Sequence, residues 1–380
     1  MENRKMVPEI RFSGFTDPWE QRKVEEITVR LSSICSDTNL PRVEYEDIVS
    51  GTGQLNKDIY AKKSRKSGIA FHKGDVLYGK LRPYLQNWLL PAFDGLAVGD
   101  FWVLQPKNVD SSFLYRLIQS CQFYEVANQT TGTKMPRADW KLVSKTVFTI
   151  PSNICEQVTI GTYFIELDNL ITLHQRKLEK LKTFKKAMLD KMFPKNGKLV
   201  PEIRFSGFTD PWEQRKAKEL CSITTGKSNT QDQVDGGQYP FYIRSDTPVR
   251  SNRYLYDEEA VITIGDGNIG RVFHYVNGKF DLHQRCYKMA DFKDILAKYF
   301  YYYFSTRFYD RAMRMTAKAT VDSVRFEMIS DMEIWFPESY DEQRLIAEYL
   351  TTLCNLITLH QRKLEKLQNI KKSMLNKMFI

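Results

Sequence analysis

The stretch NLITLHQRKLEKL at residues 169–181 decides the fold, because it returns letter for letter at residues 355–367. Around each copy, apolar side chains recur at alternating steps of four and three residues, which is a period of 3.5. This period is typical of the contact seam of a coiled coil, where a polar residue usually fixes the register. We therefore expect two long helices that pack together along this seam: Ile171, His174, Leu178, Leu181, Ile357, His360, Leu364 and Leu367.

A second repeat frames the first, since VPEIRFSGFTDPWEQRK at residues 7–23 recurs unchanged at residues 200–216. The sequences enclosed by these repeats diverge, so the repeated frame has one common role and the two inserts have different ones. Each insert has strand and helix signals, which predicts an α+β fold with two mixed α/β domains. The expected divisions are a repeat segment at 1–17, domain one at 18–150, a helix at 151–199, a repeat segment plus domain two at 200–336, and a helix at 337–380.

Within the inserts we expect strands at 96–104, 143–150 and 260–264, and helices at 113–122 and 292–304. The connections also set the direction of the long helices. The first ends just before the segment that opens domain two, and the second begins just after that domain. If their seams pack together, the helices must be antiparallel, the repeat pseudo-twofold and the chain nearly circular. Residues 8–19 should then lie beside residues 374–379.

The composition favours an acidic partner and a chain without a membrane span. The 380 residues carry a net charge of +10, which most often indicates nucleic acid as the partner. No apolar run approaches membrane-spanning length, and no apolar core follows the basic N-terminus as in a signal peptide. The six cysteines form no CxxC pair, so neither a zinc site nor a disulfide framework is indicated, and a cytoplasmic location is expected.

Basic residues gather in predicted turns beside aromatic residues in both inserts. Lysine and arginine neutralise phosphates, and both also bind base edges, so these clusters favour DNA binding. For most of these residues taken singly, a solvated surface charge is the expected explanation, and the argument rests on their density in turns beside aromatic residues. The candidates are Lys62, Lys63, Arg65, Lys66, Lys80, Arg82, Lys134 and Arg137 in domain one, and Arg244, Arg250, Arg253, Arg271, Lys318, Thr320 and Arg325 in domain two.

No catalytic or metal site is predicted. GDGNIG at residues 265–270 matches the pattern GxGxxG, but the alternation in the next six residues favours a strand over the helix that a cofactor loop needs. A hairpin turn is therefore the better interpretation. Asp-Pro-Trp at residues 17–19 and 210–212 lacks the second proline of the amino-methyltransferase signature. Asp281 and His283 near Arg285 suggest either a nuclease or polar residues at a strand edge, and we favour the latter.

The order of these parts resembles the specificity (S) subunit of type I restriction–modification enzymes. The stretches 74–84, 130–140 and 264–272 each resemble the target-recognition domains of that family, and the repeated LHQRKL core resembles its spacer helices. The resemblance implies that each domain reads one half of a split double-stranded DNA target. It also implies no cofactor on this chain. Two modification subunits would bind S-adenosylmethionine and methylate adenine, and restriction subunits would use ATP and Mg to translocate and cleave the DNA.

Two other classes of protein remain as alternatives. The first is an enzyme with its own active site, a DNA methyltransferase or a nuclease. It would need a helix after Gly270 and a complete catalytic motif. The second is a purely structural coiled-coil adaptor, which would not need two large, divergent and basic inserts.

Overall fold

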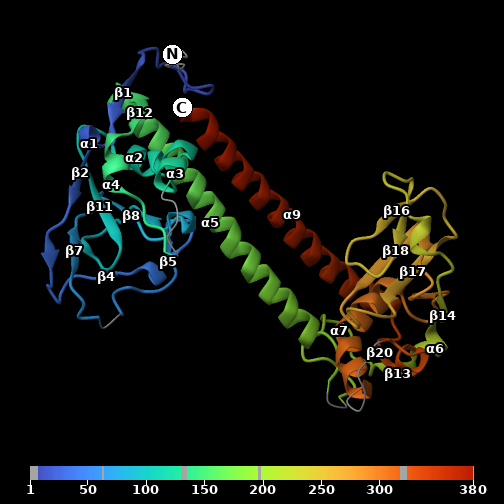
Figure 1. Ribbon diagram of the computed structural model, residues 1–380. Helices are drawn as coiled ribbons and strands as arrows, with labels where there is room; N and C mark the ends of the chain where they lie inside the picture. Colours follow the sequence, from blue (N-terminus) through green and yellow to red (C-terminus); the bar gives the residue numbers. More distant parts are fainter. Residues whose placement is uncertain (1–6, 62–63, 130–134, 196–197, 317–322, 380) are drawn as a thin grey trace. The chain divides into compact units, whose positions relative to one another are not determined.

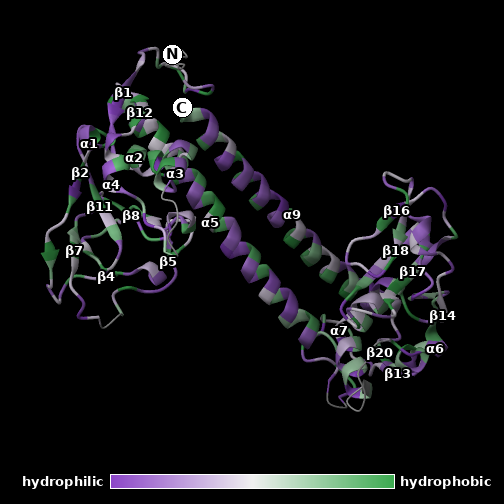
Figure 2. Ribbon diagram, viewed as in Figure 1, coloured by the Kyte–Doolittle hydropathy of each residue, from purple (hydrophilic) through white to green (hydrophobic). Residues whose placement is uncertain are grey.

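The computed structural model in Figure 1 describes residues 7–61, 64–129, 135–195, 198–316 and 323–379. The chain divides into two compact units, and both boundaries fall inside long helices. The first unit comprises Met1–Gln175 and Arg362–Ile380, and the second comprises Arg176–Gln361. The long helices are α5 (Ile154–Lys191) and α9 (Tyr340–Met378). Figure 2 shows hydrophobic and hydrophilic residues along both, as expected for helices that bury one face.

The first unit contains small sheets covered by short helices. One four-stranded sheet has the order β3-β7-β10-β4, and a second has the order β2-β11-β8-β9. Its strands are β1 (Trp19–Lys23), β2 (Thr28–Leu31), β3 (Ile34–Cys35), β4 (Arg42–Val43), β5 (Ile48–Val49), β6 (Gln54–Leu55), β7 (Gly68–Phe71), β8 (Val76–Gly79), β9 (Trp88–Leu89), β10 (Gly95–Ala97), β11 (Phe101–Pro106) and β12 (Val147–Pro151). Its short helices are α1 (Val24–Ile27), α2 (Ser111–Leu117), α3 (Cys121–Ala127) and α4 (Trp140–Lys145).

Three predictions for this unit were wrong in their bounds. The single strand expected at 96–104 is two strands in different sheets, because Gly99 has a φ of 101° and turns the chain between them. The helix expected at 113–122 is α2 and α3, each with its own N-cap: Asp110 accepts from the Phe113 amide at 3.0 Å and Ser120 from the Phe123 amide at 3.3 Å. The strand expected at 143–150 begins only at Val147, after α4.

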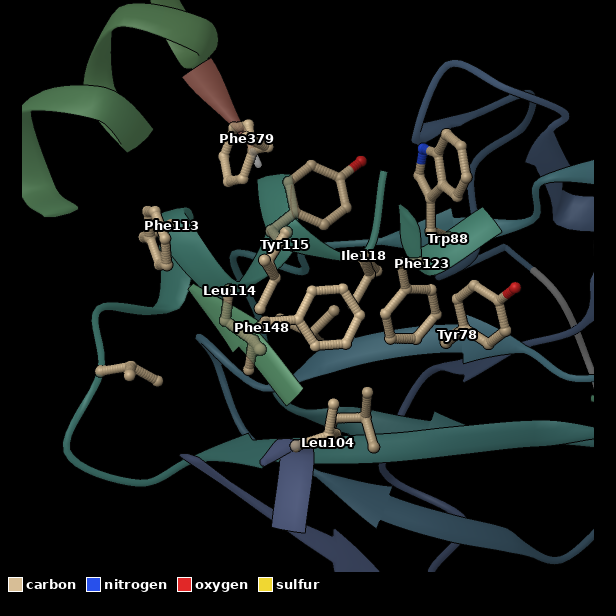
Figure 3. Packing of buried hydrophobic residues seen from close by; sticks show 14 of the residues in the cluster. Tyr78, Trp88, Leu104, Phe113, Leu114, Tyr115, Ile118, Phe123, Phe148 and Phe379 are labelled. Carbon is tan, nitrogen blue, oxygen red and sulfur yellow. The ribbon is translucent and has the colours of Figure 1, made fainter. Parts of the chain in front are cut away.

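The start of α5 and the end of α9 belong to the core of the first unit. Figure 3 shows aromatic side chains of this core from α2, α3 and β12 together with Phe379. The rings of Phe113 and Phe379 stack at 5.5 Å, and those of Phe164 and Phe379 lie 6.3 Å apart. Lys371 pairs with Asp168 at 2.7 Å, so the two helix segments run in opposite directions within this unit. The predicted placement of residues 8–19 is confirmed, because the Ile10 amide donates to the Lys377 carbonyl at 3.3 Å.

The second unit contains a six-stranded sheet with the order β14-β19-β17-β18-β15-β16. The strand expected at 260–264 is part of β17, whereas the helix expected at 292–304 begins later and is longer. Aromatic residues of that helix, α7, fill the core of this unit beside Trp212. The strands are β13 (Glu213–Lys216), β14 (Ser222–Thr225), β15 (Tyr239–Tyr242), β16 (Val249–Ser251), β17 (Tyr256–Ile264), β18 (Phe273–Leu282), β19 (Cys286–Ala290) and β20 (Glu333–Phe336), and the helices besides α5 and α9 are α6 (Ala217–Leu220), α7 (Ala297–Thr316) and α8 (Phe326–Ser330).

Candidate nucleic-acid interface

The duplicated segment forms the same buried clamp in each unit. In the first, Arg11 donates to both carboxylate oxygens of Glu156 at 2.7 and 2.8 Å, and the Trp19 indole donates to the same carboxylate at 3.2 Å. Strands β1 and β12 pair beside the clamp, with Trp19 opposite Pro151. The hydrogen bond with Glu156 is the main reason that the pKa of the Arg11 guanidinium is raised. The clamp therefore fixes the start of α5 against the domain that precedes it.

The second unit repeats this geometry with the twin residues. Arg204 donates to Glu342 at 2.7 and 2.8 Å, and the Trp212 indole donates to it at 3.3 Å. Strands β13 and β20 pair as β1 and β12 do. The clamps thus hold two divergent domains in the same manner, each at the start of a long helix.

In the first unit, the fold brings together two of the predicted basic stretches. Leu81 forms an isolated antiparallel bridge with Arg137. Next to it, the Arg82 amide donates to the Pro136 carbonyl at 2.7 Å, and the Ala138 amide donates to the Lys80 carbonyl at 2.8 Å. The stretch 74–84 and the described part of the second stretch, residues 135–140, are far apart in the sequence but therefore form one surface.

Asp100 lies at the centre of that surface. Arg137 pairs with its carboxylate at 3.0 Å and Lys80 at 3.5 Å, while the Tyr45 hydroxyl donates to its backbone carbonyl at 2.7 Å. Burial alone would raise the pKa of Asp100, but the hydrogen bond and charge of Arg137 and the charge of Lys80 lower it below its ordinary value. The ionised Asp100 orients two cations whose side chains stay 53% and 33% exposed, which leaves Arg137 and Lys80 able to reach a phosphate or a base edge.

The other candidates of domain one are dispersed. Lys66 is exposed and pairs with Glu44 at 3.3 Å, and Arg65 is exposed on the same loop. Arg82 is half-buried in a left-handed conformation with a φ of 48°, next to Lys80. Lys62, Lys63 and Lys134 lie outside the described residues.

The second unit builds a matching site with different residues. Asp266, which follows β17, accepts from Arg285 at 2.8 Å and from Arg244 at 3.3 Å. It forms an isolated antiparallel bridge with Ser323, and the Val324 amide donates to the Gly265 carbonyl at 2.6 Å. In both units, then, an acidic residue pairs with two cations near an isolated bridge. The loop before α4 meets the loop after β8 in the first unit, and the loop before α8 meets the loop after β17 in the second.

Sequence reasoning missed Arg285 as a DNA-binding candidate, although it lies in a turn two residues before Tyr287. It also missed both organising aspartates, because only cations and aromatic residues were sought. Of these three residues, only Arg285 could have been found from the sequence, because the criterion of a cation in a turn beside an aromatic residue had selected Arg244 and Arg271. Asp100 and Asp266 become recognisable only when their cationic partners are brought together.

Four more arginines of domain two have defined partners. Arg253 pairs with Asp232 at 2.6 Å and donates to Ser228 at 3.0 Å, and Arg250 donates to the Gly237 carbonyl at 2.8 Å. These bonds tie loops together. Arg271 donates to the Tyr309 hydroxyl at 2.8 Å while its guanidinium lies over that ring. The exposed Arg325 stands at the N-cap position of α8 without a side-chain capping bond and donates to the Met315 carbonyl at 3.4 Å. Lys318 and Thr320 lie outside the described residues.

The loop at residues 265–270 joins β17 to β18 in an antiparallel hairpin, as predicted. The structure does not support a nuclease site at Asp281 and His283 either, because both residues make structural hydrogen bonds. Asp281 accepts from Ser228 at 2.5 Å and from Arg253 at 3.4 Å, whereas His283 accepts a backbone hydrogen bond from Arg285 at 3.1 Å. Burial is the main cause of the lowered pKa of His283. Across the described residues, no cluster of histidine, cysteine, aspartate or glutamate could hold a metal ion.

The predicted seam residues are buried or half-buried in both long helices. Ile171 packs in the core of the first unit with Leu364 and Leu367 of α9. His360 is buried with 6% of its surface exposed, and Leu178 with 5%. Their partners in the predicted seam, His174, Leu181 and Ile357, are half-buried.

Residues 209–369 match the family described as "Type I restriction modification DNA specificity domain". Over these residues the chain is therefore similar to type I restriction–modification DNA specificity domains. It is 29% identical over 162 residues to the specificity subunit of the type I restriction enzyme EcoDI from Escherichia coli, a match that spans 42% of this chain and 35% of that subunit. It is 24% identical over 336 residues to the MjaVIII specificity subunit from Methanocaldococcus jannaschii, across 77% of this chain and 78% of the relative.

Solved structures of such subunits share the fold. The S subunit of a type I restriction–modification system from M. genitalium aligns with a TM-score of 0.71 at 14% identity, across 99% of both chains. A chain from a structure of type I restriction–modification complex assembly aligns with a TM-score of 0.52 at 17% identity, across 94% of this chain and 96% of that one. The resemblance predicted from the sequence is confirmed. In the described part of the chain, no helix is long and apolar enough to cross a membrane.

Proposed function

We propose that this chain is the DNA-recognition subunit of a type I restriction–modification complex and that each domain reads one half of a bipartite target. The observation that carries the proposal is the pair of sites at Asp100 and Asp266. Each lies beside the isolated bridge that its domain forms at the same offset in the repeat, Leu81 with Arg137 or Asp266 with Ser323, yet one uses Lys80 and Arg137 and the other uses Arg244 and Arg285. Equivalent positions with different side chains are what two unlike half-sites require.

The long helices have two roles in this proposal. As an antiparallel coiled coil with a pseudo-twofold repeat, they set the distance between the half-sites. Their exposed faces bind the modification subunits. The repeat leaves the same leucines exposed in each copy: Leu170 and Leu173 at 46% and 60%, and Leu356 and Leu359 at 38% and 47%. Exposed leucines in a charged helix favour a protein partner, and two identical patches favour two copies of that partner.

Catalysis lies on the other subunits in this proposal. The modification subunits bind S-adenosylmethionine, and the restriction subunits use ATP and Mg. The chain itself takes no cofactor. The second candidate function, a DNA methyltransferase or nuclease with its own active site, draws on the GxGxxG match, which is a hairpin turn here.

The test is a gel shift with the chain and the modification subunits of the same host. Binding to the host's methylated target sequence should weaken steeply as salt rises, because phosphate contacts release counterions. The purified chain alone should neither bind S-adenosylmethionine nor methylate DNA. Methylation by the chain alone would instead establish the second candidate.

A further inference from the structure

A basic pocket lies in the second unit, outside the sites described above. It encloses about 320 Å³ between the end of α7, the segment that follows α5, and β20. Five cations and one carboxylate line it: Lys195, Lys198, Arg307, Arg311, Arg314 and Glu333. The arginines are four and three residues apart on α7, which places them on one face of the helix.

The hydrogen bonds of the pocket orient its arginines without neutralising them. Lys195 pairs with Asp190. Among the described residues, the arginines bond to backbone carbonyls: Arg307 to Phe193 at 3.5 Å, Arg311 to Met328 at 2.8 Å, and Arg314 to Asp310 at 3.3 Å. A guanidinium has five N–H donors in a planar fork, so most donors stay available. Such forks match phosphate oxygens well.

The pocket continues the candidate DNA interface of the same unit. Val324 is bonded at the Asp266 site, and the next residue, Arg325, donates to the Met315 carbonyl at 3.4 Å, beside Arg314. Met328, whose carbonyl accepts from Arg311, comes four positions after Val324, so their Cα atoms are at most about 14 Å apart. Phosphates of one strand advance about 3.4 Å per nucleotide along the axis of the duplex, so that distance corresponds to at most about four nucleotides.

In the described part of the first unit, the positions equivalent to the three arginines of the pocket carry no cation. The repeat offset is 186 residues (355 minus 169), which places Cys121, Glu125 and Asn128 opposite Arg307, Arg311 and Arg314. A partner that docks alike on both repeats would need the same residues twice. A row of arginines that has no basic counterpart at the equivalent described positions of the first unit instead suits a ligand that differs between the two halves, which is the DNA of the half-sites.

We infer that the basic pocket binds backbone phosphates of the DNA, within about four nucleotides of the bases contacted at the Asp266 site. The inference rests on the proposed function and adds to it. These contacts carry no sequence information, so they raise affinity for every sequence alike and hold domain two in register on its half-site.

The test substitutes two exposed members of the pocket, Lys198→Ala with Arg314→Ala. Both side chains lie outside the core, and Lys293→Ala with Arg344→Ala is the matched control, which removes one exposed lysine and one exposed arginine from the same unit. Each lost phosphate contact should reduce the salt slope by about 0.9 and weaken binding about 5-fold at 0.15 M salt, so the double variant should bind about 30-fold more weakly. The loss should be equal for target and non-target sequences, and the control should bind as the unaltered chain does.

A second measurement needs no altered protein. A series of duplexes, each with one neutral methylphosphonate, should show one or two sensitive phosphates beside the half-site of domain two. Those positions should lose their effect in the Lys198→Ala, Arg314→Ala variant.

Three outcomes would overturn the inference. The variant could bind DNA with unchanged affinity and salt slope, the control could lose as much as the variant, or the variant could bind DNA normally but no longer retain the modification subunits. The last result would assign the pocket to an acidic protein segment. In contrast, an unaltered chain that showed no salt-dependent DNA binding would contradict the proposed function itself.

Discussion

Replacement of Glu156 by alanine should destabilise the first unit and leave the second intact. Glu156 has 0% of its surface exposed, its partner Trp19 is buried, and its partner Arg11 is half-buried. The substitution removes two charge-assisted bonds at 2.7 and 2.8 Å and one indole bond at 3.2 Å. The Arg11 guanidinium then keeps its bond to the Asp17 carbonyl at 2.6 Å but loses its counterion, and the Trp19 indole N–H loses its acceptor. Loss of one partner from a buried ion pair costs about 3–5 kcal/mol. The Arg11 side chain retains 13% exposure, so we expect a value near the lower limit, about 3 kcal/mol.

The twin clamp supplies the matched experiment. Glu342→Ala should cost the second unit a similar amount, because Arg204 and Trp212 make bonds of the same lengths within 0.1 Å. Glu156→Gln keeps one acceptor without the charge and should cost about half as much as alanine.

Native-state hydrogen exchange measured against urea concentration gives the free energy of opening for each unit separately. Peptides from β1 and β12 report on the first clamp, and those from β13 and β20 report on the second. A loss below 1 kcal/mol, or a loss shared equally by both units after a single substitution, would refute the clamp as the link between each domain and its helix.

Three further predictions concern the site, the helices and the cysteines. Arg137→Ala should either relax one base position by about 1–3 kcal/mol or weaken all sequences alike, and an unchanged affinity and salt slope in DNA binding would exclude Arg137 from the interface. Insertion of one helical turn before Leu178 should lengthen the tolerated gap between half-sites or abolish recognition, as read by methylation mapping, and an unchanged target would contradict the spacer role. Burial raises the pKa of the Cys221 thiol to about 12, so alkylation at pH 8 should modify exposed Cys155 and leave Cys221 unmodified until urea unfolds the second unit. Rapid modification of native Cys221, detected by mass spectrometry, would contradict its burial.

The repeats made much of the framework predictable. Identical residues in two places indicate the same local structure, and the matching clamps at Glu156 and Glu342 are that structure. Periodicity also distinguished a hairpin from a cofactor loop at Gly270. It failed at Val143, where the apolar pattern of 143–150 looked like one strand. Asp139 accepts from the Lys141 amide at 2.8 Å and starts a short helix there instead.

The chemistry of the site was less predictable, for a physical reason. Single cations such as Lys80 and Arg137 could be chosen from composition, but 57 residues separate them in the sequence (137 minus 80). The carboxylate that joins them, Asp100, has no distinguishing local pattern. The basic pocket has the same property, since Lys198 and Arg314 come together only through the packing of α7.

The central claim is that the two domains read separate half-sites, and an exchange of one domain tests it most directly. Residues 18–150 would be replaced by the corresponding domain of a relative with a known target, within the full chain and in a host that supplies the modification subunits. Sequencing of methylated adenines across the genome then gives the new target. The account predicts a target in which one half changes to that of the relative and the other half stays as it was. A target with both halves changed, or with neither changed, would contradict independent reading by the two domains.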